Sequence, residues 1–470
     1  MKRNIIFTLF IFVSLFAKSQ LVDGIYYEFD ETTNEAKVTK NFVANYSGNI
    51  VIPQVVKYDN KEYVVTTIYP GAFRFCIDLK SVEIGEKVIS IGSNCFEGCS
   101  NLDSIKIGPN VEKIGSFAFM DCTNLKSLIL PDKVNQIGSE IFKGCASLEN
   151  LVIGDGVTFL NPQFFNGCSS IKTITFGKAI KEMQCLFPSS FSDVYINDLR
   201  AWCDIVLMGY PLYGTSNIYV EGKRIKDLII PEGVEVVKRY TFMGYLGLES
   251  IVIPETVNRI ETNSFFSCKN LKSVSISNSV ITIEDGAFSG CPNITSLKIG
   301  AGVKYIETSA FYGCHNLEVI NIPNSVISIG QNAFFECKKV KTIIIGNGVN
   351  FIEQEAFHPY ADELKDVYCY AEHVPVAGYV AFGWTDEVTL HVPEASINEY
   401  KNAAVWKDFK KIVAIKKDDP IPTGMNGIPY NKNEKMYYYS IDGKRFSQPQ
   451  NGLNILRNED GKVVKKIIKK

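Results

Sequence analysis

One cysteine recurs every 23 residues along much of this 470-residue chain. The first run is Cys76, Cys99, Cys122, Cys145 and Cys168, and the same interval separates Cys268, Cys291, Cys314 and Cys337. A fixed period of this length is typical of a solenoid, in which one unit cannot bury its own apolar face and must stack on its neighbours. The period therefore limits the fold to an array of stacked turns.

Six apolar positions repeat together with the cysteine. In the unit opened by Cys99 they are Leu102, Ile105, Ile107, Val111, Ile114 and Phe119. Positions three, six and eight after the cysteine have the L-x-x-I-x-I spacing of a short, half-buried strand. Gly or Pro usually follows at position nine, where the chain must leave the strand. Each turn is therefore predicted to carry one short strand.

A phenylalanine three residues before each cysteine position is the most regular feature. It occurs as Phe73, Phe96, Phe119, Phe142, Phe165, Phe242, Phe265, Phe288, Phe311, Phe334 and Phe357. Tyr245 and Tyr360 occupy the cysteine position in two of these units. We therefore predict a β-rich solenoid of about eleven 23-residue turns with short parallel strands.

The unit resembles the BspA-like class of leucine-rich repeats, found on bacterial cell surfaces. The family pattern C-x-x-L-x-x-I-x-I-P-x-x-V-x-x-I-G-x-x-A-F is matched nearly residue for residue from Cys314 to Phe334. The resemblance covers about three quarters of the chain and implies a leucine-rich-repeat solenoid. It also implies adhesion to host matrix proteins or other cells, although repeat scaffolds serve many unrelated functions.

The N-terminal region divides into three predicted parts. Residues 1–19 combine Lys2 and Arg3 with a short apolar run and small residues, as in a secretory signal peptide. Residues 20–67 contain four strand-like segments and are predicted to form a β cap on the first turn, whose open edge would otherwise invite aggregation. Residues 68–177 hold turns one to five.

The period is interrupted between Cys168 and Tyr245. Residues 178–227 are predicted to be an elaborated repeat that continues the solenoid, with a domain boundary as the alternative. A hairpin is expected at Gly222. Similar inserts containing Trp-Cys occur in the BspA-like family. Residues 228–357 hold turns six to eleven, of which the last is degenerate.

The C-terminal region again divides into three parts. Residues 358–415 are predicted to form a strand and helix cap, with the helix over 394–409, and residues 416–426 a polar linker. Residues 427–470 have hairpin signals at Asp442-Gly443 and Asp460-Gly461 and are predicted to be a small β module. This module resembles the C-terminal sorting tails of proteins exported by type IX secretion; the alternative is a simple edge hairpin.

The net charge indicates which kind of partner to expect. The net charge of −2 gives no indication of a basic face, so nucleic acid is not expected as a partner.

Nine of the 13 cysteines repeat in register. Neighbouring turns would place their Cα atoms about 4.8 Å apart, within disulfide range. Equivalent side chains point in parallel rather than at each other, however, so we predict buried free thiols.

Catalytic motifs are missing from the sequence. The four histidines, His315, His358, His373 and His391, show no metal-ligand spacing, and there is no C-x-x-C pair, G-x-S-x-G elbow or phosphate-binding loop. No enzymatic activity, cofactor or metal is therefore expected. Beyond residues 1–19, no segment is long and apolar enough to be a transmembrane helix.

Two outward rows on the predicted strands are the candidate binding residues. Positions five and seven after the cysteine alternate with core positions. For the first five turns they are Ser81, Glu83, Ser104, Lys106, Ser127, Ile129, Asn150, Val152, Thr173 and Thr175. The rows form a long, shallow face, which suits a macromolecule better than a small ligand. Ile129 and Val152 are expected to form its apolar centre, although Ser and Thr also simply suit exposed strands.

The sequence thus predicts a secreted or cell-surface protein that binds other proteins without catalysis. A surface module for glycans or nutrients, or a periplasmic scaffold, is the alternative. The glycan alternative would need exposed aromatic stacking platforms, and the outward rows contain none. A hydrolase with a site near Trp202 to Tyr213 would need converging carboxylates.

Overall fold

The computed structural model describes residues 19–421, apart from 186, 189, 190, 361, 362 and 417, and the strand residues 437–439, 445–446, 452–457 and 463–469. The chain divides into two compact units, residues 1–422 and residues 423–470. The division falls within the predicted linker. The predicted signal peptide lies outside the described residues except for Ser19.

Short strands at the N-terminus begin the first unit. They are β1 (Ser19–Val22), β2 (Ile25–Asp30), β3 (Glu35–Val38), β5 (Val55–Tyr58) and β6 (Lys61–Ile68). Strands β1, β2 and β3 are joined as antiparallel neighbours, and β5 pairs antiparallel with β6. Strand β6 then pairs parallel with the first solenoid strand on that side. Alternation of buried residues in β2, β3 and β6 places their apolar side chains in the core.

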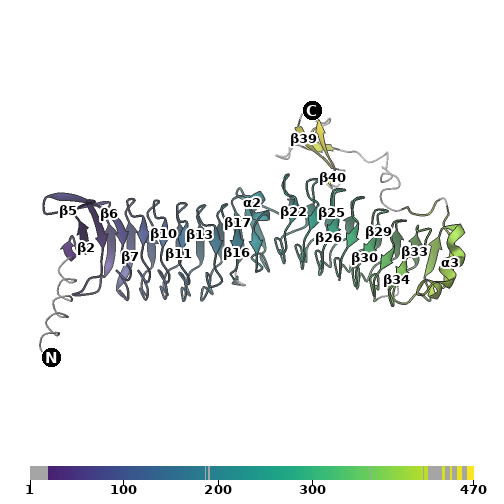
Figure 1. Ribbon diagram of the computed structural model, residues 1–470, viewed down its shortest axis with the longest axis horizontal. Helices are drawn as coiled ribbons and strands as arrows, with labels where there is room; N and C mark the ends of the chain where they lie inside the picture. The colour runs from purple at the N-terminus through teal and green to yellow at the C-terminus, as the bar shows by residue number, and fades with distance from the viewer. Residues whose placement is uncertain are drawn as a thin grey trace, which may run out of the picture. The chain divides into compact units, whose positions relative to one another are not determined.

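One series of parallel strands carries the predicted L-x-x-I-x-I segment, and we call its solvent-facing side the outer face (Figure 1). Its members are β4 (Gly48–Ile52), β7 (Leu79–Ile84), β9 (Ser104–Lys106), β11 (Ser127–Leu130), β13 (Asn150–Ile153), β15 (Thr173–Phe176), β17 (Asp193–Ile196), β19 (Asn217–Val220), β21 (Asp227–Ile229), β23 (Ser250–Val252), β25 (Ser273–Ser275), β27 (Ser296–Lys298), β29 (Val319–Ile322), β31 (Thr342–Ile345), β33 (Asp366–Cys369), β35 (Thr389–Val392) and β36 (Lys411–Ala414).

A second series of two-residue strands lines the other side of each turn. Its members are β8 (Ser90–Ile91), β10 (Lys113–Ile114), β12 (Gln136–Ile137), β14 (Phe159–Leu160), β16 (Glu182–Met183), β18 (Val206–Leu207), β22 (Val236–Val237), β24 (Arg259–Ile260), β26 (Thr282–Ile283), β28 (Tyr305–Ile306), β30 (Ser328–Ile329), β32 (Phe351–Ile352) and β34 (Val376–Ala377). These strands are too short to show alternation in sequence, so only one strand per turn was predicted.

The solenoid has about 15 turns rather than the predicted eleven. The additional turns lie in the cap regions and in the insert, where the spacing departs from the regular period. Thr173 pairs with Asp193, and Asp193 pairs with Asn217, so one step is shorter and the next is longer than that period. The cysteine and phenylalanine pattern does not detect such turns.

The insert continues the outer series and then interrupts it. Strands β17 and β19 extend the sheet in parallel, and β19 turns back through Glu221 and Gly222 into β20 (Lys223–Arg224), forming the expected hairpin. Strand β21 begins a new sheet. Backbone bonds from Gly214 to Gly244 (3.0 Å) and from Leu246 to Thr215 (2.9 Å) join the chain across this break.

The core repeats one packing scheme from turn to turn. Phenylalanine rings stack on one another, as in Phe96 and Phe119, whose centroids are 5.6 Å apart and whose planes differ by 2°. All 13 cysteines are free and buried. The Cys99 thiol donates to the Phe73 carbonyl oxygen at 3.0 Å, and the same bond recurs in seven further turns. Burial raises the pKa of the Cys99 thiol to about 12.

Strand β36 and several short helical segments close the C-terminal end of the first unit. Where one helix over 394–409 was predicted, the structure has η1 (Glu394–Ser396), α3 (Ile397–Asn402) and η2 (Trp406–Asp408). The helix ends because Ala403 has an extended backbone with a ψ of 140°, and Val405 follows with a φ of 72°. The resulting bend accompanies full burial of the rings of Tyr400 and Trp406. The insert carries one further short helix, α2 (Leu199–Cys203).

The second unit contains a small antiparallel sheet. Its strands are β37 (Tyr437–Tyr439), β38 (Arg445–Phe446), β39 (Gly452–Arg457) and β40 (Val463–Lys469), in the order β38-β37-β39-β40.

Candidate functional site

The ten residues predicted as a binding face lie on outer-series strands β7 to β15. Each is exposed or half-buried and alternates with a buried neighbour. Pairing between strands aligns them in two columns. One contains Ser81 and Ser104, followed by Ser127, Asn150 and Thr173; the other contains Glu83 and Lys106, followed by Ile129, Val152 and Thr175. Strands β9 and β11 belong to different sheets, so each column has two stretches.

Both columns continue into the insert, whose residues were not among the ten predicted from the sequence. Thr173 pairs with Asp193 and Thr175 with Tyr195, and the next strand adds Asn217 and Tyr219. The rings of Tyr195 and Tyr219 stack with centroids 4.7 Å apart and planes 11° apart. The expectation that the outward rows contain no aromatic platform was therefore wrong. Steps of irregular length concealed these tyrosines from a count that follows the cysteine period.

The second column consequently forms a continuous row that is apolar at one end and aromatic at the other, with one threonine between them. From Ile129 it passes through Val152 and Thr175 to Tyr195 and Tyr219. The first column beside it is polar throughout, and the Asn217 side-chain amide donates to Asp193 at 2.8 Å. An apolar row flanked by donors and acceptors has the make-up of a protein-binding surface with aromatic anchors.

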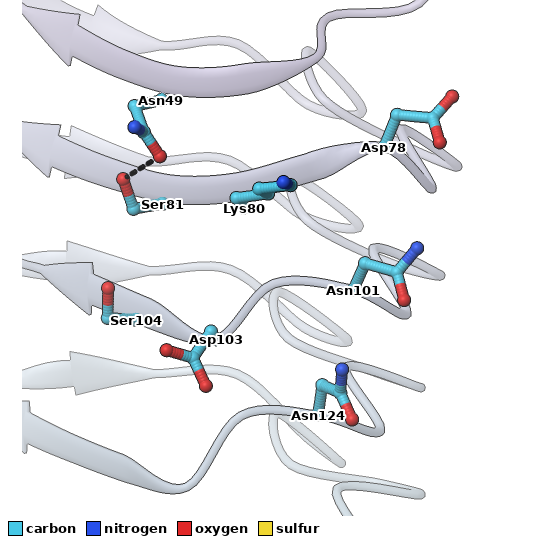
Figure 2. A pocket seen from close by; sticks show the side chains of 8 residues that line it. All are labelled: Asn49, Asp78, Lys80, Ser81, Asn101, Asp103, Ser104 and Asn124. Carbon is cyan, nitrogen blue, oxygen red and sulfur yellow. Dashed lines mark hydrogen bonds between the residues drawn. The ribbon is translucent and has the colours of Figure 1, made fainter.

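At the N-terminal end, the outer face has a polar hollow of about 650 Å³ (Figure 2). It is lined by Asn49, Asp78, Lys80, Ser81, Asn101, Asp103, Ser104 and Asn124. Ser81 donates to the Asn49 side-chain oxygen at 2.8 Å. Figure 2 shows Asp78, Asn101 and Asn124 aligned at one end of successive turns. The hollow thus extends the polar column with amides and carboxylates.

Two asparagines of this hollow have unused side-chain groups. The amides of Asn101 and Asn124 make no side-chain hydrogen bond within the described part of the chain. At the same repeat position farther along, Asn270 donates to the Leu246 carbonyl at 2.7 Å and Asn293 to the Lys269 carbonyl at 2.8 Å. In those turns the amide holds adjacent turns together. In the hollow it remains available to a partner.

Alternating charges beside the polar column were also missed. Position four after the cysteine holds Lys80, Asp103, Lys126, Glu149 and Lys172. Lys126 lies 3.4 Å from Asp103, and Lys172 lies 3.0 Å from Glu149. The regular change of sign at one repeat position was the signal in the sequence. Exposed pairs of this kind contribute little to stability, but they can orient a charged partner.

The C-terminal part of the outer face is covered by its own chain. Residues 418–421 lie over strands β29 to β35, where Tyr370 donates to the Pro420 carbonyl at 2.7 Å and Asn321 donates to the Ile421 carbonyl at 3.3 Å. His391 Nδ1 lies 3.8 Å from an Asp419 carboxylate oxygen. We call residues 418–421 the covering segment. The two columns on β7 to β19 lie apart from these contacts, and we call this stretch the open part of the outer face.

The histidines occupy separate positions. His391 bonds Asp366 at 2.8 Å and stacks on Tyr368, His315 lies 3.6 Å from Glu336, His358 is buried, and His373 is exposed. Within the described residues, no three His, Cys, Asp or Glu side chains are arranged to hold a metal. The helices found there are also too short or too polar to cross a bilayer.

Comparison with known proteins identifies the class to which this fold belongs. The model of the BspA-type leucine-rich repeat region matches residues 66–194 and 235–362 in six copies, which is more than half of the chain. No curated protein matches the chain significantly. The chain belongs to the BspA-type leucine-rich repeat family.

Two solved structures of bacterial repeat proteins match most of this chain. A leucine-rich repeat protein from Bacteroides ovatus is 24% identical with a TM-score of 0.51, and the match covers 84% of this chain and 100% of that one. A leucine-rich cell surface protein from Faecalibacterium prausnitzii is 27% identical with a TM-score of 0.38, and the match covers 74% of this chain and 94% of that one.

Proposed function

We propose that this protein binds a protein partner through the open part of its outer face and catalyses no reaction. The observation that carries the proposal is the row from Ile129 to Tyr219, which is solvent-facing and flanked by a polar column. Aromatic anchors surrounded by polar groups are the usual centre of a protein interface. Membership of the BspA-type family supports adhesion to host matrix proteins or other cells as the biological role.

Binding to immobilised extracellular-matrix proteins and to intact cells tests this proposal. The variant Ile129→Asp with Val152→Asp places two charges in the apolar row and should weaken binding at least about tenfold, because charges at an interface core lose their hydration. Val319→Asp is the matched control, since Val319 is an exposed aliphatic residue on the outer face of β29. Equal binding by both variants would exclude the row as the binding site.

We also propose that the chain is exported and displayed on the cell surface or secreted. Residues 1–19 support entry into the export pathway, and the similarity of the C-terminal module to type IX sorting tails supports attachment or release at the surface. Fractionation of the native host with mass spectrometry of both protein ends tests this. Recovery of the protein from the periplasm with residues 425–470 intact would contradict surface display and favour an internal scaffold.

A further inference from the structure

A cluster of aromatic side chains lies at one edge of the C-terminal turns, apart from the residues proposed to bind protein. The residue directly after the core phenylalanine is Tyr312, Phe335 and His358 in three successive turns. The same position holds Arg74, Glu97 and Lys143 in earlier turns. The repeat fold therefore does not require an aromatic residue there. Tyr360 and Trp384 complete what we call the aromatic cluster.

The rings of the cluster form one connected set. Tyr312 stacks on Phe335 at 5.5 Å, and Tyr360 lies against both Phe335 and His358, at 5.5 and 4.7 Å. Trp384 meets His358 edge-on at 5.1 Å and Tyr360 at 5.8 Å with an interplanar angle of 65°. Tyr360 and Trp384 are 57% and 63% exposed. Two large rings thus present apolar surface to solvent in fixed orientations.

His358 lies beneath these two exposed rings and is only 6% exposed. Its Nδ1 accepts the Tyr360 backbone N–H at 3.2 Å, so in the neutral ring the proton is on Nε2. Burial lowers the pKa of His358, which keeps the ring neutral near pH 7. Within the described residues Nε2 has no hydrogen-bond partner. The cluster therefore contains an unused N–H donor among aromatic rings.

A carboxylate, that of Glu336, lies near the cluster. The Glu336 carboxylate lies 3.6 Å from His315 and 3.7 Å from Lys338. Burial, and after it the nearby Glu336 charge, raise the pKa of Tyr312. The Glu336 backbone N–H donates to the His358 carbonyl at 2.9 Å, which places Glu336 beside the ring cluster in the neighbouring turn. Apolar ring faces bordered by a few directed polar groups are typical of a small-ligand site.

We propose that the aromatic cluster binds a sugar ring of a neutral carbohydrate. The apolar C–H face of the sugar would pack on Trp384 and Tyr360. One sugar hydroxyl would accept a hydrogen bond from the Nε2–H group of His358, and another would donate a hydrogen bond to the Glu336 carboxylate. The two exposed rings are far smaller than the roughly 800 Å² that each partner buries in a stable protein interface. A cation would be attracted to ring faces, but the Glu336 carboxylate already lies 3.7 Å from the Lys338 ammonium, and the His358 N–H donor would repel a cation.

Tryptophan fluorescence reports on this site directly. The chain has three tryptophans, of which Trp202 and Trp406 are fully buried and Trp384 is exposed. Acrylamide quenching of the full-length protein therefore measures access to Trp384. Cellohexaose, maltohexaose and chitohexaose are the probes. At least one should protect Trp384 from quenching in a saturable manner, whereas tetramethylammonium should not.

Variants separate specific binding from general effects. Tyr360→Ala and Trp384→Ala should each weaken the affinity for the active sugar at least about tenfold by calorimetry, while Tyr305→Ala, which removes an exposed tyrosine from β28, should leave it unchanged. Fluorescence of Trp202 and Trp406 that stays shielded from acrylamide shows that each variant is folded. Trp384→Phe keeps an aromatic ring and should retain most of the affinity. No protection by any sugar at about 10 mM, a concentration that detects Kd values in the millimolar range, would overturn the proposal. Protection by tetramethylammonium alone would also overturn it.

Discussion

Ile129 and Ile344 occupy the same repeat position on the outer face, seven residues after their cysteines, yet they differ in environment. Ile129 on β11 is 63% exposed, whereas Ile344 on β31 is 4% exposed. Ile129 lies on β11, the edge strand of its sheet, and pairs with Val152, whereas Ile344 lies between its parallel partners Asn321 and Tyr368. The difference shows that strand position alone does not decide which outward residues are available to a partner.

We infer that the covering segment causes this difference. Asn321 and Tyr370 lie on either side of Ile344 along the solenoid. Both donate hydrogen bonds to backbone carbonyl groups of the covering segment. Beneath the outer face, by contrast, the two stretches have the same core. Phe96 stacks on Phe119 at 5.6 Å in the first stretch, and Phe311 stacks on Phe334 at 5.0 Å in the second. We therefore expect the two stretches to have equally stable core packing but different exposure of their outward side chains.

The largest expected effect concerns the cysteines of both cores. A thiol with an ordinary pKa of 9.0 is about one-tenth thiolate at pH 8, whereas a pKa of about 12, as in Cys99, leaves about one part in ten thousand. We expect the native protein to react with a thiol reagent at least about a thousandfold more slowly than the unfolded protein. Mass spectrometry after timed labelling measures this at each cysteine.

The thiol experiment tests whether the two stretches have equally well packed cores. Cys99 and Cys122 represent the first stretch, and Cys314 and Cys337 the second; all four are buried. Their labelling should be slow to a similar degree. Rapid labelling confined to one pair would show that the two stretches differ in core packing as well as in surface.

The next effect separates the two isoleucines. Ile344→Ala should lower the free energy of local unfolding by about 2–4 kcal/mol, because it leaves a cavity beneath the covering segment. Ile129→Ala should change it by no more than about 0.5 kcal/mol, since the side chain is exposed. Hydrogen exchange of β31 and β11 measures each stretch by itself, which is necessary because long repeat arrays can unfold in parts. Equal losses at both sites would contradict the assignment of the covered region.

Much of the fold was predictable because the core has a period. The phenylalanine and cysteine positions, the L-x-x-I-x-I strands and the outward direction of Ile129 all follow from residues fixed every 23 positions. The turn count was too low for a physical reason. A turn can lengthen or shorten in its loops while its strand still pairs in register, as Thr173, Asp193 and Asn217 do.

The candidate site was only half predictable. Alternation identifies outward residues, so the two columns could be placed on β7 to β15. The bonds from Asn321 and Tyr370 to the covering segment, in contrast, join residues that are several turns apart in the chain, and no local pattern encodes them. The stacked pair of Tyr195 and Tyr219 was missed because its strands belong to turns without the cysteine mark.

The smallest expected effect tests the covering segment itself. Tyr370→Phe removes the hydroxyl that donates to the Pro420 carbonyl at 2.7 Å. Because the freed carbonyl can bond to water, the loss should be about 1 kcal/mol. This raises the open population of the segment roughly fivefold. Trypsin cleavage after Lys416 should accelerate by that factor, since cleavage follows the open population when closing is fast.

A matched substitution completes the comparison. Tyr305→Phe alters an exposed tyrosine on the second strand series and should leave cleavage after Lys416 unchanged. Opening of the segment by Tyr370→Phe should also raise exchange around Ile344 but not around Ile129, because the segment bonds to Asn321 and Tyr370 on the strands that flank Ile344. If cleavage and exchange both stay at their original rates, the hydroxyl does not hold the segment, and the burial of Ile344 must depend on its strand neighbours Asn321 and Tyr368 instead.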